Sequence, residues 1–503
     1  MSRRRFYITT AIPYVNGDPH LGHALEFVQA DVLARHRRLR LDDVRFLSGT
    51  DDNALKNVDA ALAAGLPVAE FVSEKAQRFV DLAPSLQLSN DDFIRTSTDP
   101  RHRPGVERLW EACAEAGDLY QRDYEGLYCA GCEAFVSPAD LDGGLCPEHG
   151  GRPELILERN WFFRLSRYQA ALLELIESGR LRIKPEHRRN EVLSFIRAGL
   201  DDFSVSRAKE RARDWGIRVP GDPSQVIYVW FDALANYITA LDYGHDEDLY
   251  DEWWRAADER VHVIGKGITR FHAIYWPAIL LSAQQPLPTT IFVHDYLTVE
   301  GQKLSKSRGT SVDPLEVIDR YGSDALRWWF LRDVPPAGDA DFRSEQIAVR
   351  ANELADGLGN LINRTIALIS RNRPDRLPAR NGTVSEAARL VALCVGLPAA
   401  VDKALADFDL RAAASELWEV VVEANRFVSS TRPWELAKAA RAGDGGAATR
   451  LEAVLGVLLD ACRCIADELR PFLPVAAERI NVALSDLDVR QGRALFPKAE
   501  AAA

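Results

Sequence analysis

The chain has 503 residues, of which 47% are hydrophobic and 27% charged, and its formal net charge is −12. This length suits roughly two to four globular domains. The negative charge argues against a protein that mainly coats nucleic acid, although a local basic surface is compatible with it.

Targeting signals and disulfides are not expected. No apolar run approaches the roughly 18 residues that a membrane-spanning helix needs. The N-terminus is basic but is followed by no long apolar core, which argues against a secretory signal. Seven cysteines, an odd number, do not indicate a disulfide framework. We therefore expect a cytoplasmic protein.

The first elements predict a nucleotide-binding sheet. Residues 6–12 are rich in β-formers and lead into the Pro- and Gly-containing loop 13–19, which indicates a strand and a tight turn. Apolar residues recur at helical spacing over 22–40, and a second short strand is expected at 44–47. Strand, loop, helix and strand in this order are typical of a doubly wound parallel sheet.

The character of the chain then changes twice. Residues 115–160 are Gly-rich and contain cysteines, which indicates an insertion, whereas 345–480 have almost no strand signal and predict a helical bundle. We expect an α/β fold with a Rossmann-like sheet in two halves, an insertion and a C-terminal α-helical bundle. The expected boundaries are 1–114, 115–225, 226–342 and 343–503.

Two short motifs point to phosphate chemistry. His20-Leu21-Gly22-His23 lies where the first loop meets the first helix, and a helix N-terminus favours anions. Lys303-Leu304-Ser305-Lys306-Ser307 follows about 280 residues later, and two lysines in a loop can neutralise a triphosphate. Each motif alone is weak, because surface histidines and lysines are common. As a pair they resemble the nucleotide motifs of the class I aminoacyl-tRNA synthetases.

Within that class the chain resembles the methionyl-tRNA synthetases from residue 7 to about residue 434. The segments that support this resemblance are 11–17, 20–23, 160–166, 215–220, 228–233, 264–266 with 271–272, and 303–307. The resemblance implies ATP-dependent activation of methionine to an adenylate, followed by transfer to initiator and elongator methionine tRNAs. No appended domain suggests a dimer, so we expect a monomer.

The resemblance also implies the residues of the active site. The expected catalytic residues, which stabilise charge on the phosphates of Mg²⁺-ATP, are His20, His23, Lys303 and Lys306. The expected ATP-binding residues are Asn16, Gly22, Gly265, His294, Lys303, Ser305 and Lys306. Methionine is expected to lie among Ile12, Tyr14, Asp52, Trp230, Ala233, Tyr237, Ile268 and His272. Aromatic rings suit a thioether, and Asp52 can pair with the substrate ammonium. For each aromatic residue alone, core packing is the more common role.

Four residues predict a zinc site. Cys129 and Cys132 form one close pair, and Cys146 and His149 form a second. Two such pairs separated by a loop are typical of a tetrahedral Zn²⁺ site of the Cys₃His kind. The alternative interpretation is a set of free buried cysteines. The family often has such a knuckle in an insertion, in agreement with the first interpretation.

The helical bundle is expected to bind tRNA. The resemblance places Arg364 and Trp434 at positions that read the anticodon, and a Trp can stack on an unpaired base while an Arg bonds its edge. The alternative for Trp434 is simple packing between helices.

The chain departs from the family at three places near the expected site. Asn53-Ala54 stands where the family usually has His-Gly, Gly267 where it has Asp, and Asp295 where it usually has Gly. These departures leave two other functions open. One is a paralogue that transfers its aminoacyl group to a small-molecule acceptor, and the other is a non-catalytic tRNA-binding paralogue.

Overall fold

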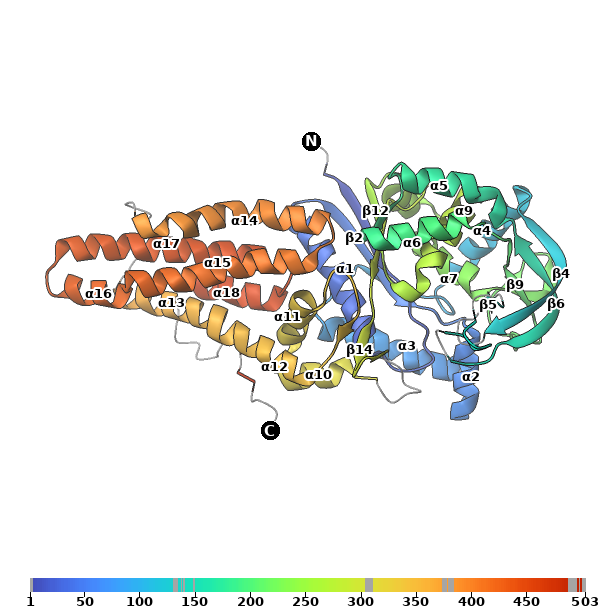
Figure 1. Cartoon of the computed structure of the whole chain (residues 1–503), viewed down its shortest axis with the longest axis horizontal. Helices are drawn as coiled ribbons and strands as arrows, with labels where there is room; N and C mark the ends of the chain where they lie inside the picture. The colour runs from blue at the N-terminus through green and yellow to red at the C-terminus, as the bar shows by residue number, and fades with distance from the viewer. Residues whose placement is uncertain are drawn as a thin grey trace. The chain divides into compact units, whose positions relative to one another are not determined.

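The computed structural model describes residues 3–129, 134–136, 138, 141–147, 150–303, 311–372, 378, 384–486, 495–496 and 498–499 (Figure 1). The chain forms two compact units. The first contains residues 1–30, 41–84 and 89–295, and the second contains 31–40, 85–88 and 296–503. No helix in the described part of the chain is long and apolar enough to cross a membrane.

A six-stranded parallel sheet forms the centre of the first unit. Its strand order is β3-β2-β1-β12-β13-β7, and all neighbouring strands run parallel. The strands are β1 (Arg5–Thr10), β2 (Asp43–Thr50), β3 (Asp92–Arg95), β7 (Arg182–Lys184), β12 (Glu259–Gly265) and β13 (Thr290–His294). The two strands predicted at the start of the chain are confirmed, and so is the parallel α/β class.

Helices pack around this sheet, because the apolar sides of the helices and the apolar faces of the sheet are stabilised when they are buried from water. They are α1 (Leu21–Leu39), α2 (Leu55–Ala64), α3 (Val68–Ser85), α4 (His102–Glu115), α5 (Gln169–Glu177), α6 (Glu186–Arg197), α7 (Val229–Thr239), α8 (Asp248–Tyr250) and α9 (Trp276–Ser282). Helix α7 is buried along its whole length. It therefore lies inside the unit, where its side chains can form the wall of a site.

The inserted segment forms antiparallel sheets. One has the order β5-β4-β6-β8, and another has the order β10-β11-β9. The strands are β4 (Leu119–Cys129), β5 (Ala134–Val136), β6 (Glu154–Phe163), β8 (Phe203–Ser204), β9 (Ser206–Ala208), β10 (Arg218–Val219) and β11 (Asp222–Ile227). Strands β4 and β6 pair over ten residues each. Apart from α5, β7 and α6, which lie within residues 115–225, the described part of the insertion is thus a β structure built on the long β4–β6 ladder.

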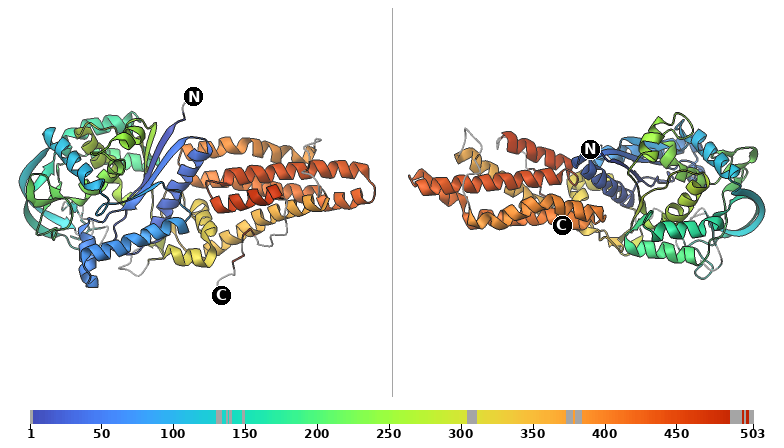
Figure 2. Two further views of the ribbon diagram at one scale, coloured as in Figure 1. Left: turned by 180° about the vertical axis from the view of Figure 1, so that it is seen from behind. Right: turned by 90° about the horizontal axis from the view of Figure 1, so that it is seen from above.

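The second unit begins with a small sheet and continues as helices. The sheet contains β14 (Leu297–Val299), β15 (Gln302–Lys303) and β16 (Ala340–Asp341). The helices are α10 (Pro314–Tyr321), α11 (Ser323–Asp333), α12 (Ser344–Glu353), α13 (Asn360–Asn372), α14 (Ala388–Ala406), α15 (Leu410–Thr431), α16 (Pro433–Arg441), α17 (Gly445–Leu469) and α18 (Pro474–Asp486). The long helices α14, α15 and α17 run side by side (Figure 2). This confirms the predicted C-terminal helical bundle.

A buried arginine connects several segments of this second unit. Arg327 on α11 is fully buried, and its guanidinium donates to Asp31 at 2.7 Å and to the carbonyl oxygens of Leu86, Pro471 and Phe472. A buried charge is tolerated when it is paired and its remaining hydrogen bonds are satisfied. These bonds connect α11 to the second half of α1 and to the turn that follows α17.

Candidate active site

The carboxyl ends of four adjacent parallel strands lie at one edge of the central sheet. In an open α/β sheet, the segments that follow such strand ends form the ligand crevice. Here these segments are 11–16, 51–54, 265–268 and 294–295 after β1, β2, β12 and β13. Tyr14 and Asp51 are joined there by a backbone bridge. Parts of the chain up to 280 residues apart in the sequence, such as Tyr14 and His294, therefore meet at one edge.

An aromatic cluster lies at this edge. The Trp230 ring stacks on Phe271 with centroids 3.8 Å apart and planes 5° from parallel. Tyr14 and His272 each approach Trp230 edge-on, with centroids 6.2 Å away. Among the described residues, Trp230 Nε1 is buried with no hydrogen-bond partner. Rings in this arrangement offer faces and edges to an apolar, polarisable side chain.

Helix α7 presents three of the predicted pocket residues on one side. Trp230, Ala233 and Tyr237 are spaced i, i+3 and i+7, so they share a helix face. Ile12 and Ile268 are partly buried and pack against the same hydrophobic core. The predicted methionine residues are thus brought close to one core region, although their role in binding stays a prediction.

A hydrogen-bonded pair fixes the ring of His272. His272 Nδ1 donates to the Ile268 carbonyl at 2.9 Å, because a carbonyl oxygen only accepts. Its Nε2 consequently accepts from the Tyr237 hydroxyl at 2.7 Å. Burial lowers the pKa of His272 to about 4. The pair therefore presents a neutral polar surface to the cluster at neutral pH.

Asp52 is buried, and one of its two carboxylate oxygens accepts hydrogen bonds. Its Oδ2 accepts from Ser97 Oγ at 2.6 Å and from Arg95 Nε at 3.3 Å. Among the described residues, Oδ1 is buried without a hydrogen-bond partner. Burial raises the pKa of Asp52, an effect that Ser97 and Arg95 partly offset. A buried oxygen without a donor suits a ligand ammonium.

The two motif histidines stack at the start of α1. The rings of His20 and His23 have centroids 3.7 Å apart and planes 10° from parallel. The Gly22 N–H donates to His20 Nδ1 at 3.1 Å, and the His20 N–H donates to His23 Nδ1 at 3.2 Å. A neutral ring whose Nδ1 accepts holds its proton on Nε2. Each ring can therefore donate from Nε2 to a phosphate oxygen, near the exposed Asn16.

Glu26 and His294 form a second buried pair beside β1. Glu26 Oε1 accepts from the Ala11 N–H at 2.8 Å, and Oε2 lies 3.0 Å from His294 Nε2. Burial raises the pKa of Glu26, and the hydrogen bonds to His294, Ala11 and Gly265 work against this. The pair links β1, β12 and β13 where the predicted ATP residues Gly265 and His294 lie.

Several predicted residues lie outside the described residues. They are Ser305 and Lys306 of the lysine motif, with the side chain of Lys303, and the zinc candidates Cys132 and His149. The other two zinc candidates, Cys129 and Cys146, are both buried. No group of three or more metal-binding side chains occurs within the described part of the chain. The zinc prediction is therefore not tested by this geometry.

The comparisons with known proteins identify the family. A family model described as tRNA synthetases class I (M) matches residues 6–152 and 132–366. The chain belongs to this family. It is 41% identical over 500 residues to a methionine–tRNA ligase of Brucella melitensis, covering 98% of this chain and 94% of the relative. It is 38% identical to a methionine–tRNA ligase of Bacillus subtilis, covering 99% and 78%.

Solved structures agree with this family assignment. The structure of Mycobacterium tuberculosis methionyl-tRNA synthetase in complex with methionyl-adenylate matches with a TM-score of 0.90 at 37% identity. The match covers 99% of this chain and 98% of that one. The fold expected from the resemblance is thereby confirmed over nearly the whole chain.

The structure gives a reason for two of the departures from the family. Ala54 precedes α2 with φ −67°, a conformation that needs no glycine. Asp295 is buried and forms an ion pair with Arg188 on α6, and its other oxygen lies 3.9 Å from His187 Nε2. The extra negative charge beside His294 is therefore balanced. Gly267 lies in the short 3₁₀ turn Lys266–Ile268, and nothing in the structure explains it.

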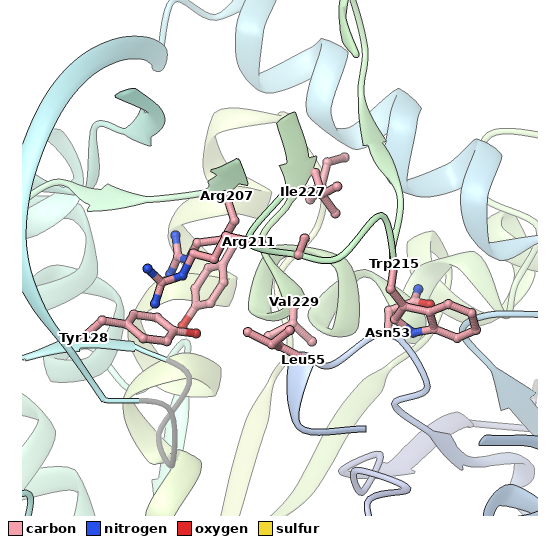
Figure 3. A pocket seen from close by; sticks show the side chains of 11 residues that line it. Asn53, Leu55, Tyr128, Arg207, Arg211, Trp215, Ile227 and Val229 are labelled. Atoms are coloured by element: carbon pink, nitrogen blue, oxygen red, sulfur yellow. The ribbon is translucent and has the colours of Figure 1, made fainter. Parts of the chain in front are cut away.

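A small hollow, open to solvent, lies beside the loop that follows β2 (Figure 3). Tyr128, Arg207 and Arg211 line one part, and Asn53 and Trp215 line another. The Arg211 guanidinium lies over the Tyr128 ring at 4.3 Å. None of the residues predicted to bind methionine is among those that line this hollow.

The predicted tRNA-binding residues lie on neighbouring helices of the second unit. Arg364 is exposed on α13, and Trp434 is 48% exposed at the start of α16. Helices α13 and α16 are in contact. An exposed Trp next to a helix that presents an Arg is compatible with base recognition, and this role stays a prediction.

Sequence reasoning missed several residues of the site. Phe271 was seen only as part of a motif, although it makes the closest ring contact with Trp230. Glu26 and Arg188 lie on amphipathic helices, where a charged residue is usually solvated. Their roles depend on partners 268 and 107 residues away, for which the sequence has no local signal.

Proposed function

We propose that this protein is a methionine–tRNA ligase that activates methionine with ATP and transfers it to tRNA. The observation that supports this most directly is the similarity to methionine–tRNA ligases over nearly the whole chain, together with the aromatic cluster around Trp230. The comparisons give no support to a small-molecule acceptor or to a non-catalytic role.

The first step is an in-line displacement at phosphorus. A carboxylate oxygen of methionine attacks the α-phosphorus of ATP, the bond to the β-phosphate oxygen breaks, and pyrophosphate leaves. His20, His23, Lys303 and Lys306 stabilise the charge on the phosphates, with Asn16, Gly22, Gly265, His294 and Ser305 holding the nucleotide. No side-chain nucleophile is required, because positioning and electrostatics supply the acceleration.

The side chain of the substrate methionine lies in the aromatic cluster, and the α-ammonium group of the substrate pairs with Asp52. Trp230, Tyr14, Tyr237 and His272 surround the thioether, with Ile12, Ala233 and Ile268 as apolar walls. In the second step a terminal ribose hydroxyl of tRNA attacks the acyl carbon, and AMP leaves. Arg364 and Trp434 contact the tRNA anticodon.

Two metals belong to this proposal. Mg²⁺ accompanies ATP and adds positive charge at the phosphates. Zn²⁺ is bound by Cys129, Cys132, Cys146 and His149, and buried thiols at Cys129 and Cys146 fit a structural site. Purified protein is expected to contain about one equivalent of zinc, which a Cys129→Ser/Cys132→Ser variant loses. Native protein without zinc would contradict this assignment.

One assay tests the main proposal. ATP–pyrophosphate exchange is measured with each of the twenty amino acids, and tRNA is then added with the preferred one. Exchange driven by methionine, followed by charged tRNA, is expected. Exchange driven by another amino acid, or an adenylate that no tRNA discharges, would refute the proposal. Light scattering tests the expected monomer.

A further inference from the structure

Helix α7 has a second face that carries no proposed substrate contact. Asp232 and Thr239 are spaced i and i+7, so they share a face that Trp230, Ala233 and Tyr237 do not occupy. Both residues are buried. A carboxylate on a fully buried helix must be paired with donors to be tolerated.

Each oxygen of Asp232 accepts one hydrogen bond from a different part of the chain. His102 Nε2 on α4 donates to Oδ1 at 2.5 Å. Asn53 Nδ2, in the loop that follows β2, donates to Oδ2 at 2.8 Å. His102 Nδ1 also lies 2.8 Å from the Thr239 hydroxyl. The chain Asn53–Asp232–His102–Thr239 therefore connects this face of α7 to α4 and to the loop after β2.

The packing of α4 on α7 makes this chain possible. A Cβ atom at Gly105 would lie 2.5 Å from Thr239 Cγ2 and 2.6 Å from the Tyr243 carbonyl oxygen. Only glycine allows α4 to approach α7 this closely. His102, one turn earlier on α4, consequently reaches both Asp232 and Thr239.

The same loop holds the carboxylate proposed for the substrate ammonium. The Asp52 N–H donates to Thr96 Oγ1 at 2.9 Å, and the Asp52 carbonyl accepts from Trp215 Nε1 at 2.9 Å. Asn53 is the next residue, so its bond to Asp232 connects the Asp52 loop with the helix that carries Trp230 and Tyr237.

We infer that Asn53, Asp232 and His102 are positioning residues, which fix Asp52 and the α7 pocket face relative to each other for methionine binding. This inference rests on the proposed function. It also explains the departure at Asn53, where the family usually has His. The Nδ2 atom of Asn and the Nδ1 atom of His are the same number of bonds from the backbone, so each can donate to Asp232.

Two substitutions of the same residue separate the hydrogen bond from the shape. Asn53→Asp keeps the shape but places an acceptor against the Asp232 carboxylate, whereas Asn53→His keeps a donor. In ATP–pyrophosphate exchange we expect Asn53→Asp to raise the KM for methionine about 10-fold or more, since small misplacements of binding groups are costly. The KM for ATP should stay within about twofold, and Asn53→His should stay within about threefold for both substrates.

The matched control is Asn90→Asp, because the Asn90 amide donates to the Asp92 carbonyl and not to a side chain of α7. It should leave both KM values unchanged. Thr239→Val is a second probe that adds no charge, and it should raise the KM for methionine about twofold to fivefold while the KM for ATP does not change. This variant also decides the matter if Asn53→Asp does not fold.

The outcomes distinguish this inference from the proposed function. Equal KM values for Asn53→Asp and wild type, or equal increases for methionine and ATP, would overturn the positioning role. A lower melting temperature with unchanged KM values would do the same. Wild-type exchange driven by a different amino acid would refute the proposed function alone, and the variants would then be measured with that amino acid.

Discussion

The sheet edge of the first unit and the helical bundle of the second present their candidate residues in opposite ways. At the sheet edge, Trp230, Asp52 and His272 are all buried and fixed by rings or hydrogen bonds. In the bundle, Arg364 and Trp434 project from helix surfaces. A small substrate is recognised by being enclosed, so its residues must be rigid before it arrives. A macromolecule brings its own surface, and exposed side chains suffice to meet it.

The largest expected effect concerns Lys306, which is proposed to act in the chemical step and not in recognition of methionine or tRNA. Lys306→Ala should lower the rate of ATP–pyrophosphate exchange by about 10²-fold or more, because the lysine proposed to donate to the phosphates is lost. Lys209→Ala is the control, since Lys209 pairs with Asp214 at the surface. Unchanged exchange in Lys306→Ala would remove this lysine from the mechanism.

The bundle should affect only the second step. Trp434→Ala is expected to lower kcat/KM for tRNA charging by about 10-fold, on the scale of losing one base stack. Its rate of methionine-dependent exchange should not change, because adenylate formation does not involve tRNA. Val422→Ala, also exposed on the bundle, is the control. Reduced exchange in Trp434→Ala would indicate packing between helices instead of tRNA contact.

Much of the fold could be predicted from the sequence, because local pattern determines it. The β-forming residues of 6–12 predict the strand, the helical spacing of apolar residues predicts the helix from Gly22, and the loss of strand signal predicts the bundle. The position of Trp230 and Tyr237 came from resemblance alone, since a buried aromatic residue has the same pattern whether it binds a ligand or packs. The contacts of His102 with Asp232 and of Glu26 with His294 could not be predicted, because they join distant segments.

Burial at the sheet edge also predicts a dependence of stability on pH. The pKa of His272 is about 4 in the folded protein and about 6.5 when unfolded. Between these values the unfolded chain binds a proton and the native state does not, so stability falls as pH falls through this window. Above this pH window His272 contributes no pH dependence to the stability. Below the window the stability that depends on its neutral form is fully lost.

The test compares wild type with His272→Gln in urea unfolding at pH 7 and pH 5.5. The wild type should lose about 1 kcal/mol more than the variant, which lacks the titrating ring. Taking the difference removes the contributions of Glu26 and Asp52, whose raised pKa values act in the opposite direction. Parallel pH profiles for the two proteins would show that His272 titrates normally.

The smallest expected effect concerns Asp295, which adds a charge beside a proposed ATP residue. Because Arg188 neutralises it, Asp295→Gly should change the KM for ATP by less than about twofold, and Arg188 keeps its contact with Glu191 at 2.7 Å. Arg188→Gln removes the ion-pair partner of this carboxylate next to His294, so more of its negative charge acts on the triphosphate. We expect the KM for ATP to rise about threefold to fivefold in that variant. The double variant should return to near the wild-type value, since both charges are then absent. If Arg188→Gln and the double variant are equally impaired, Arg188 acts on the nucleotide directly, and the pair does not explain this departure from the family.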